Sequence, residues 1–195
     1  MSTPTTTLLD RYFQSLLDLG RATACSDEDG QAIGLADAID RLRGLIRRAS
    51  SQGNTTLIAG NGGSAGIASH LAIDYSKNGG LRMMALNDAA ALTCLANDLG
   101  YEQVFAKQVE MHGRKGDLLI AISSSGRSPN ILKSVEAARA KGMDVATLSG
   151  FDADNPLRQM GDVNFFTASH LYGFVEILHT TLLHAALDFE MGWTG

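Results

Sequence analysis

Hydrophobic residues in the first 50 positions recur at helical spacing. One stripe, within residues 8–22, consists of Leu9, Tyr12, Phe13, Leu16 and Leu17. A second stripe consists of Leu35, Ile39, Leu42 and Ile46, and the polar segment CSDEDGQ between the two predicts a loop. The pattern therefore predicts two amphipathic helices, each of which must bury its apolar face on a later part of the chain or on another subunit.

From residue 55 the pattern changes to short β-rich runs that alternate with helical stretches. The predicted strands are TTLIAG, RMMAL, DLLIAI, DVATLS and VNFFTA. The predicted helices are SAGIASHLAIDYSK, residues 88–96, residues 102–112, ILKSVEAARAKG and residues 172–191. This alternation predicts an α/β fold with a five-stranded parallel sheet flanked by helices, in the flavodoxin-like strand order 2-1-3-4-5. We expect one domain over residues 1–195, with N-terminal helices in 1–52 and an α/β core in 53–195.

Composition and charge narrow the functional class. Of the 195 residues 45% are hydrophobic and 19% are charged, and the formal net charge is -5. A mildly acidic chain is a poor candidate for nucleic-acid binding, which needs concentrated Lys and Arg. We expect neither a signal peptide nor a membrane-spanning segment. Cys25 and Cys94 fit no disulfide framework, so we expect reduced thiols in a cytoplasmic protein.

Two small polar loops follow the first and third predicted strands. The first is GNGGS, Gly60 to Ser64, and the second is SSSGRS, Ser123 to Ser128. In the expected strand order these two strands are neighbours, so both loops meet at the crevice where ligands bind in open α/β sheets. Either loop alone is equally well explained as an ordinary turn, but two at adjacent strand ends favour a shared anion site.

The residue types in these loops suit a phosphate monoester. The glycines allow close backbone approach beside a helix N-terminus, whose amides carry partial positive charge. Hydroxyl donors are supplied by Ser123, Ser124, Ser125 and Ser128, and Ser128 before Pro129 is typical of a helix N-cap. Two other phosphate motifs compete. No Walker A pattern is present, and GNGGSA with Asp88 matches a dinucleotide fingerprint only weakly.

Titratable residues gather on two of the predicted helices. His70 and Asp74 are four apart, on one face of the helix after the first loop. On the last helix Glu176 and His184 lie roughly 80° apart, whereas His179 lies about 140° from His184 and is expected to stay outside the site. Two imidazoles and two carboxylates can bind zinc or a related divalent ion, or can move protons between sugar carbons. The alternative is a core histidine and a solvated carboxylate.

Four stretches together resemble the SIS (sugar isomerase) domain, and within it the phosphoheptose isomerase group. They are LIAGNGGSAGIASH, CLANDLGYEQVFAKQVE, GDLLIAISSSGRSPNILKSVEAARAKGMDVATLSG and the late helix with His184. The resemblance runs from the N-terminal helices to about Glu190. It implies a three-layer, flavodoxin-like SIS fold whose two N-terminal helices serve in oligomerisation.

The resemblance also implies a reaction and roles for individual residues. Members interconvert sedoheptulose 7-phosphate and D-glycero-D-manno-heptose 7-phosphate through an enediol, in heptose and cell-envelope polysaccharide synthesis. They are typically cytoplasmic homotetramers with sites between subunits, and often hold zinc. The substrate-binding positions would be Asn61, Gly62, Gly63, Ser64, Asn97, Asp98, Ser123, Ser124, Ser125, Ser128 and Glu176. The metal positions would be His70, Asp74, Glu176 and His184, with Asp74 as the base and His184 as acid or base.

The chain departs from the family pattern at three places. Asp74 stands where the family usually has Glu, and Glu176 stands where it usually has Gln. The stretch DYSKNGGLR is shorter than usual, with Lys77 as a replacement for a family Arg. Two other functions are therefore kept in view. One is a non-catalytic SIS module that binds sugar phosphates or associates with a replication initiator, and the other is a dinucleotide-binding protein.

Overall fold

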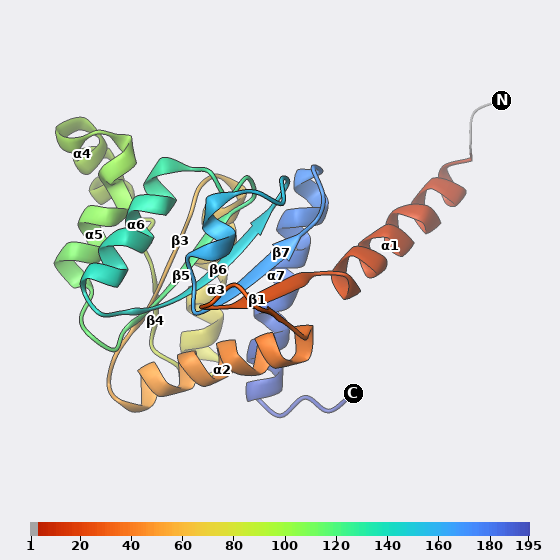
Figure 1. Cartoon of the computed structure of the whole chain (residues 1–195), viewed down its shortest axis with the longest axis horizontal. Helices are drawn as coiled ribbons and strands as arrows, with labels where there is room; N and C mark the ends of the chain where they lie inside the picture. Colours follow the sequence, from red (N-terminus) through yellow and green to blue (C-terminus); the bar gives the residue numbers. More distant parts are fainter. Residues whose placement is uncertain (1–3) are drawn as a thin grey trace.

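A computed structural model describes residues 4–195 and shows a sheet between two helical layers (Figure 1). Within these residues the strands are β1 (Ala24–Asp27), β2 (Ala32–Ile33), β3 (Thr56–Gly60), β4 (Met83–Ala85), β5 (Leu118–Ser123), β6 (Asp144–Gly150) and β7 (Val163–Thr167). The α-helices are α1 (Thr5–Arg21), α2 (Leu35–Ser51), α3 (Gly63–Lys77), α4 (Ala89–Leu99), α5 (Val104–His112), α6 (Pro129–Ala140) and α7 (Tyr172–Glu190). Two short 3₁₀ helices, η1 (Tyr101–Gln103) and η2 (Pro156–Gln159), complete the described elements.

The strand order is β2-β1-β7-β6-β5-β3-β4. The five strands from β3 to β7 are parallel and take the 2-1-3-4-5 order, which confirms the α/β prediction. The prediction that the segment CSDEDGQ forms a loop is wrong. That segment forms a β1–β2 hairpin that pairs antiparallel with β7, and its Cys25 is buried opposite Phe165. The hairpin covers an edge that β7 would otherwise expose.

The two faces of the sheet pack against different helices. Alternate residues of a strand point to opposite faces, so Ile120 of β5 packs with α2, α3 and α7, while Leu119 packs with α5 and α6. The central strands β3, β5 and β7 are buried throughout. Their continuous apolar runs follow from being covered on both sides.

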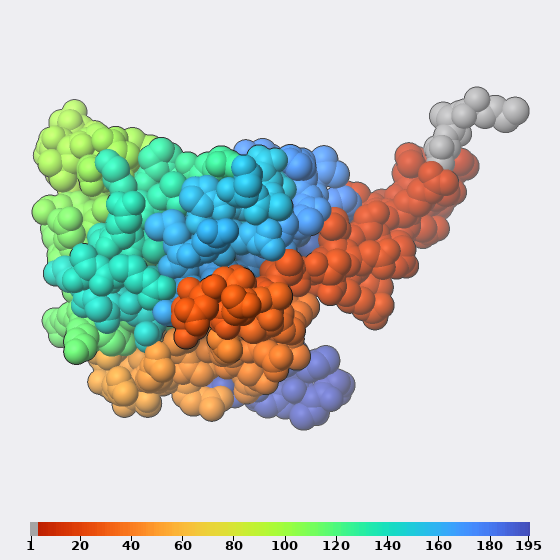
Figure 2. Space-filling model, in the orientation of Figure 1, coloured from red at the N-terminus to blue at the C-terminus, as the bar shows by residue number. Residues whose placement is uncertain are grey.

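Helix α1 projects away from the rest of the chain (Figures 1 and 2). It contains no buried residue, and Leu9, Phe13 and Leu17 are exposed along it. The expected apolar stripe is therefore present and faces outward in the single chain. Across the described part of the chain, no helix combines the length and the apolar character that crossing a membrane requires.

Candidate functional site

The two polar loops meet at the carboxyl edge of the sheet, because β3 and β5 pair directly with Gly60 opposite Ile122. A pocket of about 230 Å³ lies there. It contains the predicted loop residues Asn61, Gly62, Gly63, Ser64, Ser123, Ser124, Ser125 and Ser128. Tyr172 and Glu176 at the start of α7 complete its lining. We call this pocket the cradle.

Glycines shape the first side of the cradle. Gly62 is the N-cap of α3 and has φ 54° and ψ -122°, a conformation that L side chains rarely adopt. A Cβ on Gly60 would lie 2.6 Å from the backbone carbonyl oxygen of Ser64, so the turn closes only without a side chain. The start of α3 therefore lines the cradle with glycines at Gly62 and Gly63, which leave its backbone uncovered by side chains of their own, as anion binding at a helix N-terminus requires.

Hydroxyl groups line the second side. Ser128 is the N-cap of α6 with Pro129 as the first helical residue, as predicted, but its side chain caps no amide. The Oγ of Ser123 instead donates to the Oγ of Ser128 at 3.1 Å. Arg127, the one cation of the loop, pairs with Asp154 at 2.5 Å. The donors of the cradle are therefore amides and hydroxyls.

Asn61 is held by two residues that the sequence did not single out. Its amide exchanges two 2.9 Å hydrogen bonds with the amide of Asn130, which is 2% exposed. The hydroxyl of Tyr101 donates to Asn61 Oδ1 at 3.1 Å. Asn130 directly follows Ser128-Pro129 at the start of a helix beside the cradle, so its place near the cradle could have been predicted from the sequence. The contact of Tyr101 with Asn61 could not, because it depends on how the elements pack in the fold.

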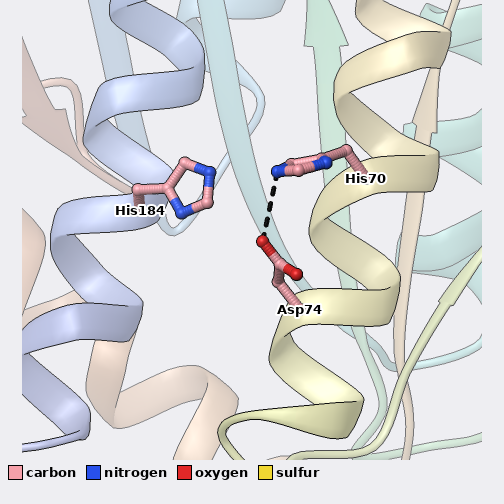
Figure 3. Close-up of side chains that lie close together, drawn as sticks. All are labelled: His70, Asp74 and His184. Atoms are coloured by element: carbon pink, nitrogen blue, oxygen red, sulfur yellow. Dashed lines mark ion pairs between the residues drawn. The ribbon is translucent and has the colours of Figure 1, made fainter.

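A second group of side chains lies further along α3 and α7. Figure 3 shows His70 and Asp74 of α3 facing His184 of α7. The Nε2 of His70 lies 3.1 Å from Asp74 Oδ2, and the rings of His70 and His184 are 5.3 Å apart between centroids. One ligand atom from each residue lies within 4.8 Å of the others. The structure thus brings together three of the four predicted metal positions, here called the His–Asp cluster.

The His–Asp cluster fits a divalent metal ion. Two imidazoles and one carboxylate are a donor set that suits zinc and related ions. His70 and Asp74 are 57% and 23% exposed, so the donors are accessible from solvent. The same contact between an imidazole nitrogen and a carboxylate oxygen is also suited to proton transfer.

Glu176, the fourth predicted metal position, lies in the cradle. Both carboxylate oxygens are 2.4 Å from the point where a Cβ on Gly63 would lie, so the carboxylate packs directly against the start of α3. It is not among the three residues of the His–Asp cluster. The structure therefore places Glu176 with the predicted substrate-binding residues.

The predicted pair Asn97 and Asp98 lies on α4. Both side chains are exposed, and Asn97 Nδ2 donates to Asp98 Oδ1 at 2.9 Å. Neither lines the cradle. Asp88, a candidate ribose-binding acid in the dinucleotide interpretation, instead accepts a hydrogen bond from the amide of Ala91 as the N-cap of α4. Its capping role explains this acid without a dinucleotide.

Three further histidines lie outside the His–Asp cluster. His179 is fully buried, and its Nε2 lies 3.1 Å from the carbonyl oxygen of Ser149. Burial lowers the pKa of His179 to about 4, and the contact with Ser149 opposes this only in part. His112 ends α5, and His170 contacts Asp152 at 3.0 Å. As predicted, His179 lies outside the His–Asp cluster.

Comparison with known proteins indicates the family to which the chain belongs. Residues 31–150, more than half of the chain, match the SIS domain family. Phosphoheptose isomerase from Yersinia pestis is 46% identical over 160 residues, which cover 78% of this chain and 81% of that protein. The Serratia proteamaculans phosphoheptose isomerase is 46% identical over 121 residues, which cover 60% of this chain and 63% of its length.

A solved structure gives the same result over the whole fold. The phosphoheptose isomerase of Neisseria gonorrhoeae superposes with a TM-score of 0.82 at 30% identity, over 96% of this chain and 99% of that one. The chain belongs to the SIS domain family, in its phosphoheptose isomerase group.

Proposed function

We propose that this protein is an aldose–ketose isomerase that interconverts sedoheptulose 7-phosphate and D-glycero-D-manno-heptose 7-phosphate through an enediol. The observation that carries the proposal is that α3 and α7 both contribute to the cradle and to the His–Asp cluster. An anion site and proton-transfer groups thus lie on the same two helices. The names of the Yersinia and Neisseria relatives, phosphoheptose isomerase, support this reaction, and we propose that it serves heptose synthesis for the cell envelope.

The cradle would hold the phosphate end of the sugar. The amides at the start of α3 and the hydroxyls of Ser123, Ser124 and Ser128 supply donors to phosphate oxygens. The Asn61–Asn130 amide pair fixes the loop between β3 and α3, so the donors are oriented before the ligand arrives. Asn97 and Asp98 are proposed to contact the sugar chain.

The His–Asp cluster would act at the carbonyl end. Asp74 is proposed as the base that carries the proton between C1 and C2. His184 would exchange protons with the carbonyl and hydroxyl oxygens, as a general acid and base. The 3.1 Å contact of His70 with Asp74 orients the carboxylate toward the space that faces His184.

A divalent ion, proposed to be zinc, would be held by His70, Asp74 and His184. When bound, such an ion polarises sugar oxygens as a Lewis acid. The use of Asp74 as a ligand competes with its use as a base, because one carboxylate oxygen cannot hold an ion tightly and accept a proton at once. Metal analysis of the wild type and of Asp74→Asn separates the two roles, since loss of a ligand lowers metal content.

The protein is also proposed to form a homotetramer with sites between subunits. The exposed apolar side of α1 supports this, since Leu9, Phe13 and Leu17 find no cover within the described part of the chain. A groove lined by Phe13, Leu178 and Leu182 continues this apolar surface between α1 and α7. Faces of this kind mark sites of protein association.

Proton NMR in deuterated water tests the reaction directly. Protein of known metal content is incubated with sedoheptulose 7-phosphate. The expected result is a heptose 7-phosphate, and deuterium at its C2 would show that the proton carried between C1 and C2 exchanges with solvent at the enediol stage. If folded, metal-loaded protein gives neither product nor exchange, the reaction is excluded for this substrate. Binding of the sugar phosphate without turnover would then favour the non-catalytic module.

A further inference from the structure

The loop between β6 and η2, residues 151–155, begins with a residue in an unusual backbone conformation. Phe151 has φ 59°, and within residues 4–195 it is the one residue other than glycine with a positive φ. This conformation is disfavoured for a bulky side chain and persists only where the surrounding contacts fix it. The contacts of Phe151 therefore indicate what the strained backbone holds in place.

The contacts of Phe151 lead to the start of α7. Its amide donates to the carbonyl oxygen of Ser169 at 3.1 Å, in the loop between β7 and α7. Its ring stacks on that of His170 with centroids 5.7 Å apart, and meets the ring of Tyr172 edge-on at 4.9 Å. Asp152 contacts Nε2 of His170 at 3.0 Å. The two loops are thus joined by a backbone hydrogen bond and by an aromatic cluster of Phe151, His170 and Tyr172.

The other end of the same loop contacts the serine side of the cradle. Asp154 pairs with Arg127 at 2.5 Å. Asn155 is 1% exposed and lies so close to Gly126 that a Cβ on this glycine would overlap the Asn155 side chain. The amide of Leu157, in η2, donates to the carbonyl oxygen of Gly126 at 3.2 Å. The segment after β6 therefore ties the serine loop to the start of α7, and these are two sides of the cradle.

Tyr172 is the member of the aromatic cluster that lines the cradle. Of the two α7 residues in that lining, Tyr172 and Glu176, only the tyrosine is an ordinary side-chain donor. A hydrogen bond from a hydroxyl to an anionic oxygen is short and stronger than one between neutral groups. The ring of Tyr172 is thus held beside an anion site by residues that themselves lie outside it.

We propose that Tyr172 is a further binding residue of the cradle, whose hydroxyl donates to a phosphate oxygen of the ligand, and that Phe151 is its positioning residue. The inference deepens the proposed function and rests on it, because it takes the cradle to be the phosphate site. Phe151 acts through Tyr172, since its ring contacts the tyrosine and is not part of the cradle lining. The strained backbone at Phe151 is the cost of holding its ring against the start of α7.

Calorimetric titration with inorganic phosphate tests the role of Tyr172. Tyr172→Phe removes only the hydroxyl and should weaken binding about tenfold, as expected for the loss of a hydrogen bond to an anion. Tyr75→Phe is the matched control, because the Tyr75 hydroxyl donates to the carbonyl oxygen of Leu183 at 2.6 Å in the core, outside the cradle lining. It should lower the unfolding temperature and change the affinity for phosphate by less than about twofold.

Phe151→Gly tests the positioning role. Glycine adopts a positive φ without strain, so relief of the backbone offsets the lost ring contacts, and the unfolding temperature should stay within about 4 °C of the wild type. The affinity for phosphate should nevertheless fall about fivefold, because the ring of Tyr172 is no longer held in place. Phe151→Tyr keeps an aromatic ring, so its affinity should stay within about twofold of the wild type.

Two further comparisons separate positioning from a general loosening of the loop. Ala153→Gly adds backbone freedom at an exposed position of the same loop without removing a ring, and should leave the affinity within about twofold. In the Tyr172→Phe background, Phe151→Gly should cost less than about twofold, because no hydroxyl is left to position. A full fivefold loss in that background would overturn the positioning role of Phe151.

The outcomes distinguish this inference from the proposed function. If Tyr172→Phe and Phe151→Gly both bind phosphate like the wild type, the inference fails and the cradle remains a phosphate site. If the wild type binds neither inorganic phosphate nor glucitol 6-phosphate, the cradle is not a phosphate site, and both proposals fail. A loss in Tyr172→Phe alone would overturn the role of Phe151. A loss in Tyr172→Phe that Phe151→Gly reproduces in part, at unchanged stability, supports the inference.

Discussion

The two faces of α7 hold histidines in opposite environments. His179 faces the sheet, is fully buried, and contacts the carbonyl oxygen of Ser149. His184 faces α3, is only partly buried, and lies with His70 and Asp74. His179 and His184 are five residues apart, which rotates their side chains by about 140° around the helix axis. The two histidines therefore lie in different environments although they are close in the sequence.

The comparison shows how the fold assigns chemistry within one helix. On the sheet side, burial keeps the imidazole of His179 neutral by lowering its pKa to about 4, and the packed strands give it no room to move. On the α3 side, His184 is partly buried beside His70 and Asp74, and Glu176 lines the cradle. The sheet side of α7 is therefore suited to stability and the α3 side to function, and substitutions on each should separate the two properties.

The largest expected effect is on activity, at His184. His184→Ala should lower kcat for the sugar phosphate by on the order of 10³-fold, because it removes a group that exchanges protons with the sugar oxygens. Its free energy of unfolding should stay within about 0.5 kcal/mol of the wild type, as for a partly exposed residue outside the core. Steady-state kinetics and urea unfolding measure the two quantities. A variant that keeps full turnover would show that His184 does not exchange protons with the sugar.

The next effect is on acid stability, at His179. The unfolded chain protonates this imidazole near its ordinary pKa of 6.5, whereas the folded protein resists until about 4. Its contribution to stability is thus fully present above pH 6.5 and is lost as the pH falls from there toward 4. The loss is about 1.4 kcal/mol for each pH unit well below 6.5, or roughly 2 kcal/mol between pH 6.5 and 5 as an upper figure.

Urea unfolding of wild type and His179→Gln between pH 7.5 and 5 measures this slope. The variant should be less stable at pH 7.5, because its amide is buried with incomplete partners. Its deficit should shrink as the pH falls, since Gln takes up no proton. Parallel pH profiles for the two proteins would show that His179 does not resist protonation in the folded state.

The sequence allowed prediction of the parallel sheet and its order because strand and helix patterns alternate clearly after residue 55. The β1–β2 hairpin could not be predicted in the same way. Its strand ACSD has no hydrophobic alternation of its own, and only Cys25 is buried in it. Its extended form depends on pairing with β7, which lies more than 130 residues later in the chain.

The candidate site was predictable where it depends on strand ends and helical angles. The GNGGS and SSSGRS loops met as expected, and helical spacing placed His70 beside Asp74. The angle between two residues around the helix axis, however, does not give the distance between them along that axis. Glu176 and His184 are eight residues apart, about 12 Å of rise, so they reach different parts of α3. The partners of Asn61 were also missed, because they arrive from other elements of the fold.

The last effect expected is a difference between two glycine substitutions at positions that contact α7. A Cβ on Gly150 would lie 2.8 Å from Val175 Cγ1 and 3.1 Å from the carbonyl oxygen of Thr167. Neither neighbour can yield easily, so Gly150→Ala should cost about 1–3 kcal/mol of unfolding free energy. The three heavy atoms nearest to a Cβ on Gly63 all belong to the end of the Glu176 side chain, which can rotate away, and Ala favours the helix over Gly. Gly63→Ala should therefore change the unfolding free energy by no more than about 1 kcal/mol, and equal costs for the two variants would contradict the contrast between a rigid and an adaptable face.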